Sequence, residues 1–408
     1  MASLKSINQD DLRNHNLSVV LDTMIRSVVP MSRAELAKAT GLTKATMSLL
    51  VPMLISNKVI REGSPVSTAM YGRPSTPLIV DGGRFCGLGL QINTDGYGFT
   101  ALDLNGDTVV EEWVGQSMND SNPDEIFSKL DVLVRQAEKT IRARSMTVTG
   151  CGLALPGLVT DDMKLLTARN LGWSRIDLSR FDIVRRLDAH PDNEANMAAL
   201  AQIPGYATQR RQGGIVGPAD SFIYISTDIG IGGAVVLEGR VQTGEHGFAG
   251  EIGHVSVSFD GPVCSCGRRG CLEAYAGRRA LVEAAGIAQG VNATRMEAID
   301  ELQKRWNSGD GATIQAVDRA VGAMASGIAS AINVLDIDTV ILGGLWERFG
   351  GALARRIERR TSPEIGGFPY VQAHVLIPEV NARPALQGAA EVGLRCLLDN
   401  PVAFMNKD

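Results

Sequence analysis

A succession of short β-rich runs joined by tight turns occurs twice in this sequence, and it constrains the fold more than any other feature. In the first succession, runs at 85–92, 97–104 and 108–114 are separated by Asn-Thr-Asp-Gly and Asn-Gly, which are strong hairpin signals. In the second, runs at 222–226, 233–237 and 240–243 are separated by a glycine-rich turn and Glu-Gly. Alternating helices and strands follow each succession, so the sequence predicts two α/β lobes that share one plan.

Length and composition place these lobes in a soluble protein of several domains. The chain has 408 residues, which predicts two or three domains at roughly 150 residues per domain. It is 44% hydrophobic and 21% charged, with a mean hydropathy of +0.03, which excludes disorder throughout. No apolar run reaches the roughly 18 residues of a membrane span, and Asp10, Asp11 and Arg13 lie where a secretory signal would be apolar. We therefore expect a cytoplasmic protein without membrane segments.

Charge is distributed unevenly along the chain. Residues 1–77 contain nine basic and five acidic side chains and carry +4, which leaves −9 on the rest of a chain whose net charge is −5. A mildly basic segment on an acidic body indicates that only the N-terminal segment approaches a polyanion such as DNA. Chance fluctuation in a short segment is the alternative interpretation.

The N-terminal segment has the helix signals of a DNA-binding motif. Apolar residues recur at helical spacing over 17–26, which predicts a first helix. Ser32, with Glu35 three residues later, is a capping box that begins a second helix, and the turn around Gly41 ends it. Thr43 then caps a third helix, and Pro52 is expected to bend it or end it early. The buried stripe expected in this third helix is Ala45, Leu49, Leu50, Met53 and Leu54.

A short helix, a glycine turn and a capped helix together predict a helix-turn-helix, whose second helix contacts base edges with its first turn. The expected DNA-contacting residues in that turn are Thr43, Lys44, Thr46 and Ser48. Residues 59–61 and 77–80 are expected to form a β-wing, with Arg73 at its tip, where a basic side chain suits a narrow minor groove. A capped surface helix and a purely structural arginine are the simpler interpretations. We predict a winged helix-turn-helix over residues 1–80.

The cysteines carry the most specific chemical signal. Cys264, Cys266 and Cys271 lie within eight residues, and His254 precedes the first of them by ten positions. Three thiolates and one imidazole form a tetrahedral ligand set that suits Zn²⁺, and a closed set of this kind is structural. A disulfide is the weaker alternative in the cytoplasm. We predict one structural zinc ion per chain.

Several motifs resemble the ROK family, whose members are transcriptional repressors and sugar kinases. They are Pro156-Gly157, residues 170–173, 192–196 and 250–254, and the cysteine run, while Gly72-Arg73-Pro74 is typical of the repressor branch. The resemblance covers nearly the whole chain and implies an actin-like (ribonuclease H-like, sugar kinase) α/β body of two lobes behind the winged helix-turn-helix. The expected domains are the DNA-binding domain at 1–80, the first lobe at 81–200, and the second lobe, with the zinc motif and sugar-site residues, at 201–408.

The resemblance also assigns sugar contacts. The positions are Asn170, Asn193, Glu194, Glu251, His254 and Glu273. Sugar hydroxyls are good donors to carboxylate oxygens, so the glutamates suit this role. Glu251 and Glu273 flank the cysteine run, so a zinc ion would anchor both of them. Without the resemblance, each carboxylate is better interpreted as a surface charge.

Kinase chemistry is expected to be lost. The family's first phosphate loop has an Asp and a Gly-Gly-Thr, whereas residues 91–95 read Gln-Ile-Asn-Thr-Asp and lack both the acid and the glycines that let a backbone approach phosphate. The second loop, at 226–233, keeps its glycines, but Asp228 places a negative charge near any phosphate. Glu194 replaces the family's catalytic Asp, and a misplacement of about 1 Å costs on the order of 10²-fold in rate. We therefore assign no catalytic residue.

These observations predict a sugar-responsive transcriptional regulator, in the first instance a repressor of genes for carbohydrate uptake or catabolism. A homodimer or homotetramer would place its winged helices on a pseudo-palindromic double-stranded operator, and a monosaccharide or sugar phosphate bound between the lobes would release it. An ATP-dependent sugar kinase that keeps a DNA-binding head is the second hypothesis. A zinc-responsive regulator without a sugar ligand is the third.

Overall fold

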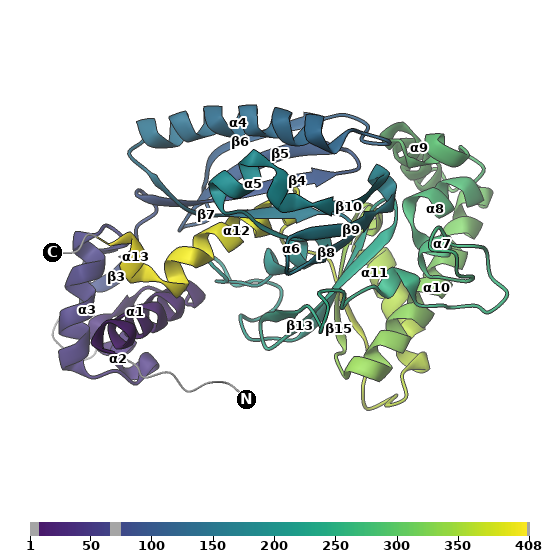
Figure 1. The fold of residues 1–408 in the computed structure, drawn as a ribbon. Coiled ribbons are helices and arrows are strands. Elements are labelled where there is room, and N and C mark those ends of the chain that lie inside the picture. Colours follow the sequence, from purple (N-terminus) through teal and green to yellow (C-terminus); the bar gives the residue numbers. More distant parts are fainter. Residues whose placement is uncertain (1–7, 66–74, 406–408) are drawn as a thin grey trace.

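The computed structural model describes residues 8–65 and 75–405, which form three parts (Figure 1). An N-terminal head, residues 8–80, lies beside two α/β lobes, each built on a five-stranded sheet. The architecture is the one expected, a winged helix-turn-helix joined to a two-lobed body. Among the described residues, no single helix is long and apolar enough to cross a membrane. The helices Arg33–Thr40 and Lys44–Ser56 pass that test only as a pair, across a bend of 116°.

The described part of the head contains helices α1 (Gln9–Arg26), α2 (Arg33–Thr40) and α3 (Lys44–Ser56) and strands β1 (Met31–Ser32), β2 (Ile60–Glu62) and β3 (Pro77–Val80). Ser32 and Glu35 form the expected capping box, and Gly41 ends α2 with a φ of 72° that favours glycine. Thr43 caps α3 by accepting a hydrogen bond from the Thr46 N–H at 3.1 Å. Strands β2 and β3 pair antiparallel, as a wing requires. The head therefore has the predicted fold.

Two details of α3 differ from expectation. The buried residues are Met47, Leu50, Val51 and Leu54, whereas Ala45 is exposed and 71% of Leu49 is exposed. Both faces of this helix carry apolar residues, so the sequence pattern left the buried face ambiguous, and packing against α2 and β2 decided it. Pro52 lies on the exposed face inside α3, and the helix continues past it to Ser56.

The first lobe is built on a sheet with the strand order β6-β5-β4-β7-β11. Strands β4 (Phe85–Asn93), β5 (Gly96–Asp103) and β6 (Thr108–Gly115) form the expected antiparallel meander, and β7 (Thr147–Leu155) and β11 (His190–Asn193) are parallel to β4. Helix α4 (Pro123–Ala143) packs on this sheet, and α5 (Asp182–Leu187) packs on α4. Strands β8 (Leu158–Thr160), β9 (Lys164–Ala168) and β10 (Trp173–Asp177) form a small separate sheet.

The second lobe repeats this plan with the strand order β14-β13-β12-β15-β16. Strands β12 (Phe222–Thr227), β13 (Ile231–Leu237) and β14 (Arg240–Gln242) form the meander, and β15 (Thr339–Gly344) and β16 (His374–Leu376) are the two parallel strands. The helices are α7 (Glu273–Ala276), α8 (Arg278–Ala284), α9 (Met296–Asn307), α10 (Gly311–Leu335) and α11 (Gly350–Thr361). The repeated hairpin signals thus correspond to a duplicated sheet topology.

The expectation that residues 201–408 form one lobe is wrong at the C-terminal end. Helix α12 (Pro384–Asp399) packs on β4 and β7 of the first lobe and on α6 (Glu194–Leu200). A Cβ atom at Gly87 would lie 2.1 Å from the Ala390 oxygen, and one at Gly152 would lie 2.3 Å from the Ala389 oxygen. The glycines of β4 and β7 therefore let the helix backbone rest directly on the first sheet.

The head is attached to the body by packed contacts. Leu17 and Leu21 of α1 share one apolar core with Leu394 and Leu398 of α12. The Asn14 side chain donates a hydrogen bond to the Asp399 oxygen at 3.2 Å. It also accepts one at 3.1 Å from the N–H of Val402, which lies in α13 (Pro401–Phe404). The head therefore lies against the C-terminal helices of the chain (Figure 1).

Candidate functional site

Strand ends and turns of the two lobes meet around a cavity of about 320 Å³. The first lobe contributes the junction between β11 and α6, and the second lobe contributes the β12–β13 turn and the segment that contains the cysteine run. All of the positions expected to contact a sugar line this one cavity: Asn170, Asn193, Glu194, Glu251, His254 and Glu273. Residues up to about 100 positions apart are thus brought together.

On the first-lobe side, Asn193 and Glu194 mark the start of α6. Asn193 caps the helix by accepting from the Ala195 N–H at 2.7 Å, and its amide donates to the Gly157 oxygen at 2.7 Å. Both ends of that side chain therefore hold the local backbone in place. Burial raises the pKa of Glu194 to about 7, although an amide hydrogen bond from Gln91, at 3.4 Å, lowers it. Glu194 is therefore a carboxyl group that titrates near neutral pH.

On the second-lobe side, Glu273 is held by two donors. Its Oε2 accepts from the Ile231 N–H at 3.1 Å and its Oε1 accepts from the Ser265 hydroxyl at 3.1 Å. A Cβ atom at Gly230 would lie 2.1 Å from Oε2, so this turn needs glycine to approach the carboxylate. Burial raises the pKa of Glu251, on the same wall of the cavity.

The predicted metal ligands form a cluster. One ligand atom from each of His254, Cys264, Cys266 and Cys271 lies within 4.8 Å of all the others, and the Cys266 and Cys271 sulfurs are 3.6 Å apart. Sulfur ligands bound to a tetrahedral zinc ion at about 2.3 Å would lie about 3.8 Å from one another. The cluster could therefore hold a metal ion without large rearrangement.

His254 joins this cluster to the cavity. Its Nδ1 lies 3.8 Å from the Cys264 sulfur, while its Nε2 lies 3.8 Å from the Glu251 carboxylate. A metal-bound imidazole commonly directs its second nitrogen to a carboxylate, which orients both groups. Ser265 lies between two of the cysteines and donates to Glu273. The cluster thus contacts both glutamates that flank the cysteine run.

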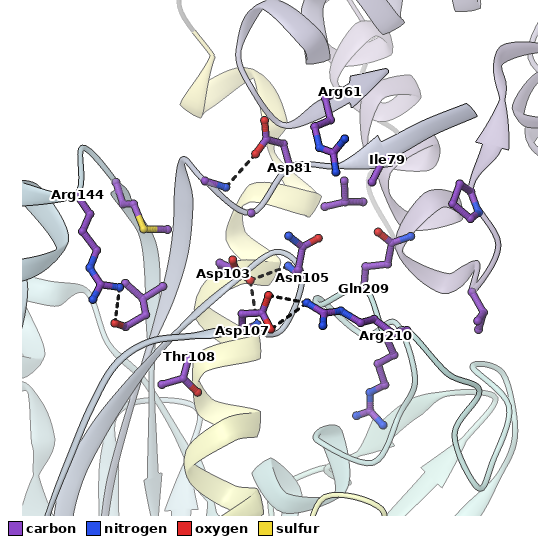
Figure 2. A pocket seen from close by; sticks show the side chains of 18 residues that line it. Arg61, Ile79, Asp81, Asp103, Asn105, Asp107, Thr108, Arg144, Gln209 and Arg210 are labelled. Atoms are coloured by element: carbon purple, nitrogen blue, oxygen red, sulfur yellow. Dashed lines mark hydrogen bonds and ion pairs between the residues drawn. The ribbon is translucent and has the colours of Figure 1, made fainter. Parts of the chain in front are cut away.

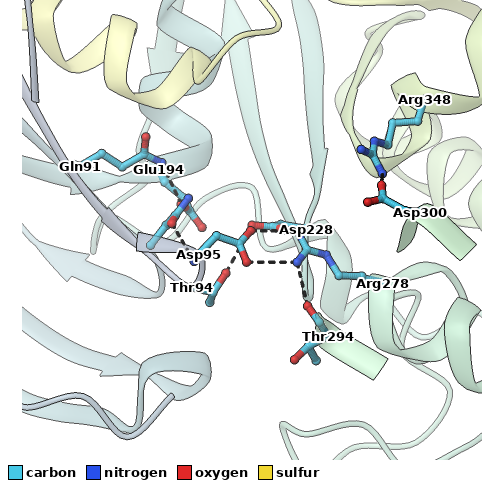
Figure 3. A network of polar contacts seen from close by, with 10 residues as sticks. Gln91, Thr94, Asp95, Glu194, Asp228, Arg278, Thr294, Asp300 and Arg348 are labelled. Carbon is cyan, nitrogen blue, oxygen red and sulfur yellow. Dashed lines mark hydrogen bonds and ion pairs between the residues drawn. The ribbon is translucent and has the colours of Figure 1, made fainter. Parts of the chain in front are cut away.

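The two turns that correspond to the expected phosphate loops face each other across the cleft (Figure 3). Asp95 follows β4 and Asp228 follows β12, and the guanidinium of Arg278 forms ion pairs with both carboxylates. The negative charge of Asp228 was expected from the sequence, whereas its pairing with Arg278 was not. No spacing rule could have identified it, because Arg278 is 183 residues from Asp95.

In the head, the expected DNA-contacting residues lie at the beginning of α3. Thr43, Lys44 and Ser48 are exposed, and Thr46 is half-buried and bonded to the Thr43 hydroxyl at 2.9 Å. Leu49, on the next turn, adds an exposed apolar group that we did not expect. Arg73 lies outside the described residues, so its role stays a prediction.

A larger cavity, of about 640 Å³, lies between the head and the first lobe (Figure 2). Protein partners already occupy most of its charged groups. Arg211 pairs with Asp107, Arg144 donates to the Val109 oxygen, and Asp103 accepts from the backbone of its own turn. None of the predicted sugar residues lines this cavity. The smaller, interlobe cavity is therefore the candidate ligand site.

Comparison with known proteins agrees with this geometry. Residues 88–395 match the sequence profile of the ROK family, which spans both lobes and α12. The chain belongs to the ROK family. One relative, the xylose repressor of Caldicellulosiruptor bescii, is 27% identical over 412 residues, covering 97% of this chain and 99% of the relative.

Two solved structures of ROK proteins have the same fold. The crystal structure of a ROK family transcriptional regulator, a homologue of the Escherichia coli MLC protein, aligns with a TM-score of 0.76 at 21% identity and covers 96% of this chain and 98% of that protein. A ROK family glucokinase from Streptomyces griseus, in complex with glucose and AMPPNP, aligns with a TM-score of 0.61 at 23% identity, covering 75% of this chain and 98% of the glucokinase. Some of these similar proteins are thus named as repressors or transcriptional regulators, and another is named as a kinase.

Proposed function

We propose that this ROK protein is a DNA-binding transcriptional repressor of carbohydrate genes that a sugar releases from its operator. The observation that carries the proposal is the combination, in one chain, of an exposed helix-turn-helix and an interlobe cavity lined by carboxylates and amides. The full-length similarity to a protein named xylose repressor supports it.

The DNA side of the proposal rests on the first turn of α3. Thr43, Lys44 and Ser48 present hydroxyl and ammonium groups that suit bases and phosphates, and Leu49 presents an apolar group that suits a thymine methyl. Two copies in a homodimer, or four in a homotetramer, would place these helices on the half-sites of a pseudo-palindromic operator. The acidic body would keep other surfaces away from DNA.

The charges around the cavity favour an uncharged sugar over a sugar phosphate. Glu194, Glu251 and Glu273 line the cavity, whereas Arg169 is the one lysine or arginine among its described lining residues. Carboxylates accept hydrogen bonds from sugar hydroxyls but repel a phosphate dianion. A volume of about 320 Å³ lies at the low end for ligand pockets and suits one sugar ring. We therefore assign a neutral monosaccharide as effector.

We also propose that the His254 and cysteine cluster holds one zinc ion with a structural role. Three thiolates and an imidazole leave no open coordination position, and His254 and Ser265 would transmit the rigidity of the site to Glu251 and Glu273. Bound zinc would supply structural anchoring and no chemical step.

The alternative, a sugar kinase with a DNA-binding head, is favoured by the kinase names among the relatives. Three features oppose it in this chain. Gln91 stands in place of the loop acid, Glu194 in place of the catalytic Asp, and Asp95 and Asp228 are paired with Arg278 between the two turns. Release of ADP in the presence of ATP and common hexoses would support the alternative.

The repressor proposal is tested on duplexes that the purified protein selects from random DNA, with fluorescence anisotropy as the readout. We expect a neutral monosaccharide to weaken operator binding about tenfold or more, and the matching 6-phosphate to have no effect. Glu251→Ala should abolish the response and leave DNA binding intact, because Glu251 lines the cavity far from α3. Glu245→Ala is the matched control, since Glu245 is exposed and lies outside the cavity lining. An unchanged response in Glu251→Ala would contradict the assigned site.

A further inference from the structure

Arg278 is a buried cation at the beginning of α8, with only 8% of its side chain exposed. Its Nη1 donates to the Thr294 oxygen at 2.9 Å and to Asp95 Oδ1 at 3.3 Å. Its Nη2 donates to Asp95 Oδ2 at 3.1 Å and forms an ion pair with Asp228. The guanidinium thus binds the Asp95 carboxylate through two nitrogens and the Asp228 carboxylate through one (Figure 3).

These partners come from both sides of the cleft. Asp95 belongs to the β4–β5 turn of the first lobe, whereas Asp228 and Arg278 belong to the second lobe. The Arg278 N–H also donates to the Asp228 oxygen at 3.1 Å, and the Thr94 hydroxyl donates to the Asp228 carboxylate at 3.5 Å. The second-lobe pair therefore forms one unit, and Asp95 and Thr94 dock onto it from the first lobe.

Electrostatics makes Arg278 necessary for this contact. Without a cation between them, the carboxylates of Asp95 and Asp228 would repel each other in a partly buried place. With the cation, the two turns are attracted. Thr94 and Asp228 also line the sugar cavity, so the separation of the two turns determines how far the cavity opens.

The packing of the lobes would allow the two turns to separate. Each lobe has its own apolar core, and the two cores are separate clusters. A third cluster, built on α6, α12 and the inner strands, lies between the sheets. At the mouth of the cleft, the lobes are joined by polar contacts, and the Arg278 Nε is buried without a hydrogen-bond partner among the described residues. A contact held by charge and incompletely satisfied breaks more readily than an apolar core.

We infer that Arg278 is an interlobe latch: it joins the β4–β5 and β12–β13 turns, holds the cleft closed in the absence of ligand, and so increases the affinity of the cavity for its sugar. Arg278 acts as a positioning residue, since it lies outside the described lining of the cavity. Closure itself follows from the ion pairs alone, and only the effect on sugar affinity rests on the proposed function.

The first measurement needs no sugar. Hydrogen–deuterium exchange of the 93–97 and 228–231 backbone, together with small-angle scattering, should compare the wild-type protein with Arg278→Met, Arg278→Lys and Asp95→Asn. We expect exchange in both turns to be about tenfold faster in Arg278→Met, with a larger radius of gyration, and Arg278→Lys to recover part of the protection because it keeps the charge. Arg348→Met is the matched control, because Arg348 pairs with Asp300 inside the second lobe (Figure 3).

The second measurement is calorimetric titration with the monosaccharide that releases the operator. Sugar affinity should fall about tenfold in Arg278→Met, since the binding-competent closed state is less populated, and remain unchanged in Arg348→Met. A double-mutant cycle of Asp95→Asn with Arg278→Met should give less than the product of the two single effects.

The outcomes separate the two ideas. If exchange and scattering of Arg278→Met and Asp95→Asn match those of the wild type, the latch is refuted whatever the sugar data show. If the turns open but no sugar binds the wild-type protein, the latch stands and the proposed effector fails. Should Arg278→Met not fold, Asp95→Asn decides alone, because it removes the first-lobe contact and leaves the pair between Arg278 and Asp228 in place.

Discussion

Burial raises the pKa of Glu391 to about 7, as it does for Glu194. Glu391 lies in α12 with no exposed surface, and the Gln387 amide lies 3.5 Å from its carboxylate. A carboxyl group whose folded pKa is above its unfolded value binds more protons in the native state. Its contribution to stability is therefore full below the unfolded pKa of about 4.5 and is lost as the pH rises through 7.

Glu391→Gln should therefore stabilise the protein at pH 8 and have little effect at pH 5. A neutral side chain avoids burying a charge, and a shift of this size corresponds to about 2 to 3 kcal/mol between the two pH values. Urea unfolding at both pH values measures the difference. Glu297→Gln, at an exposed position of α9, is the control. A gain that is equal at pH 5 and pH 8 would show that Glu391 does not titrate in this range.

At the scale of elements, the segment 252–273, which carries the candidate metal ligands, has little regular secondary structure. Apart from a short 3-10 turn at Ile252–His254, its regular pairing is two isolated bridges, between Ser256 and Cys271 and between Val263 and Arg269. Both ends of the segment pack on the second-lobe core through Ile252 and Leu272, but Phe259 and Val263 are 95% and 62% exposed, so little apolar packing holds its middle part. A closed metal site would replace the missing core.

Cys266→Ser should accordingly remove the metal. We expect elemental analysis to find about one zinc per wild-type chain and almost none in the variant, which should also bind sugar more weakly because Glu251 and Glu273 lose their anchor. Cys396→Ser is the control. Cys396 lies in α12 outside the cluster, so this variant should keep its zinc. A fully folded wild-type protein purified without any metal would refute the zinc assignment.

At the scale of the whole molecule, α12 packs both on α6, which begins at the candidate sugar site, and on the head. It packs on α6, whose first residue is Glu194, and the contact is close enough that a Cβ atom at Gly388 would lie 1.7 Å from the Met197 oxygen. At its other end, Arg395 pairs with Asp22 of α1 at 2.6 Å and donates to the Tyr206 oxygen at 2.8 Å. A movement of α6 on sugar binding therefore has a packed route to the head.

Arg395→Met should weaken this coupling. In the absence of DNA, we expect sugar affinity to stay within about twofold of the wild type, whereas the effect of sugar on operator affinity should shrink about threefold or more. Arg383→Met is the control, because Arg383, which precedes α12, pairs with Glu111 and lies over the Trp113 ring, both in β6 of the first lobe. A normal response of operator binding to sugar in Arg395→Met would exclude this contact from the coupling.

The sequence was a good guide wherever a few neighbouring residues decide the outcome. Capping hydrogen bonds determined where α2 and α3 begin, and turn residues determined the two hairpin meanders. The short spacing of Cys264, Cys266 and Cys271 brought the sulfurs of the candidate metal site together. Family resemblance was needed to collect the sugar-site positions, because each is unremarkable in its own segment.

Only the tertiary structure decided features that depend on surfaces far apart in the chain. Leu49 is exposed because the opposite face of α3 packs on α2 and β2. Helix α12 joins the first lobe because glycines in β4 and β7 let its backbone lie directly on the sheet. Arg278 joins the two lobes only because the fold brings it to Asp95, which is 183 residues away in the sequence. Local hydrogen bonds and turn conformations are determined by adjacent residues, whereas packing and long-range ion pairs require two surfaces to match, and a single sequence does not show which surfaces will meet.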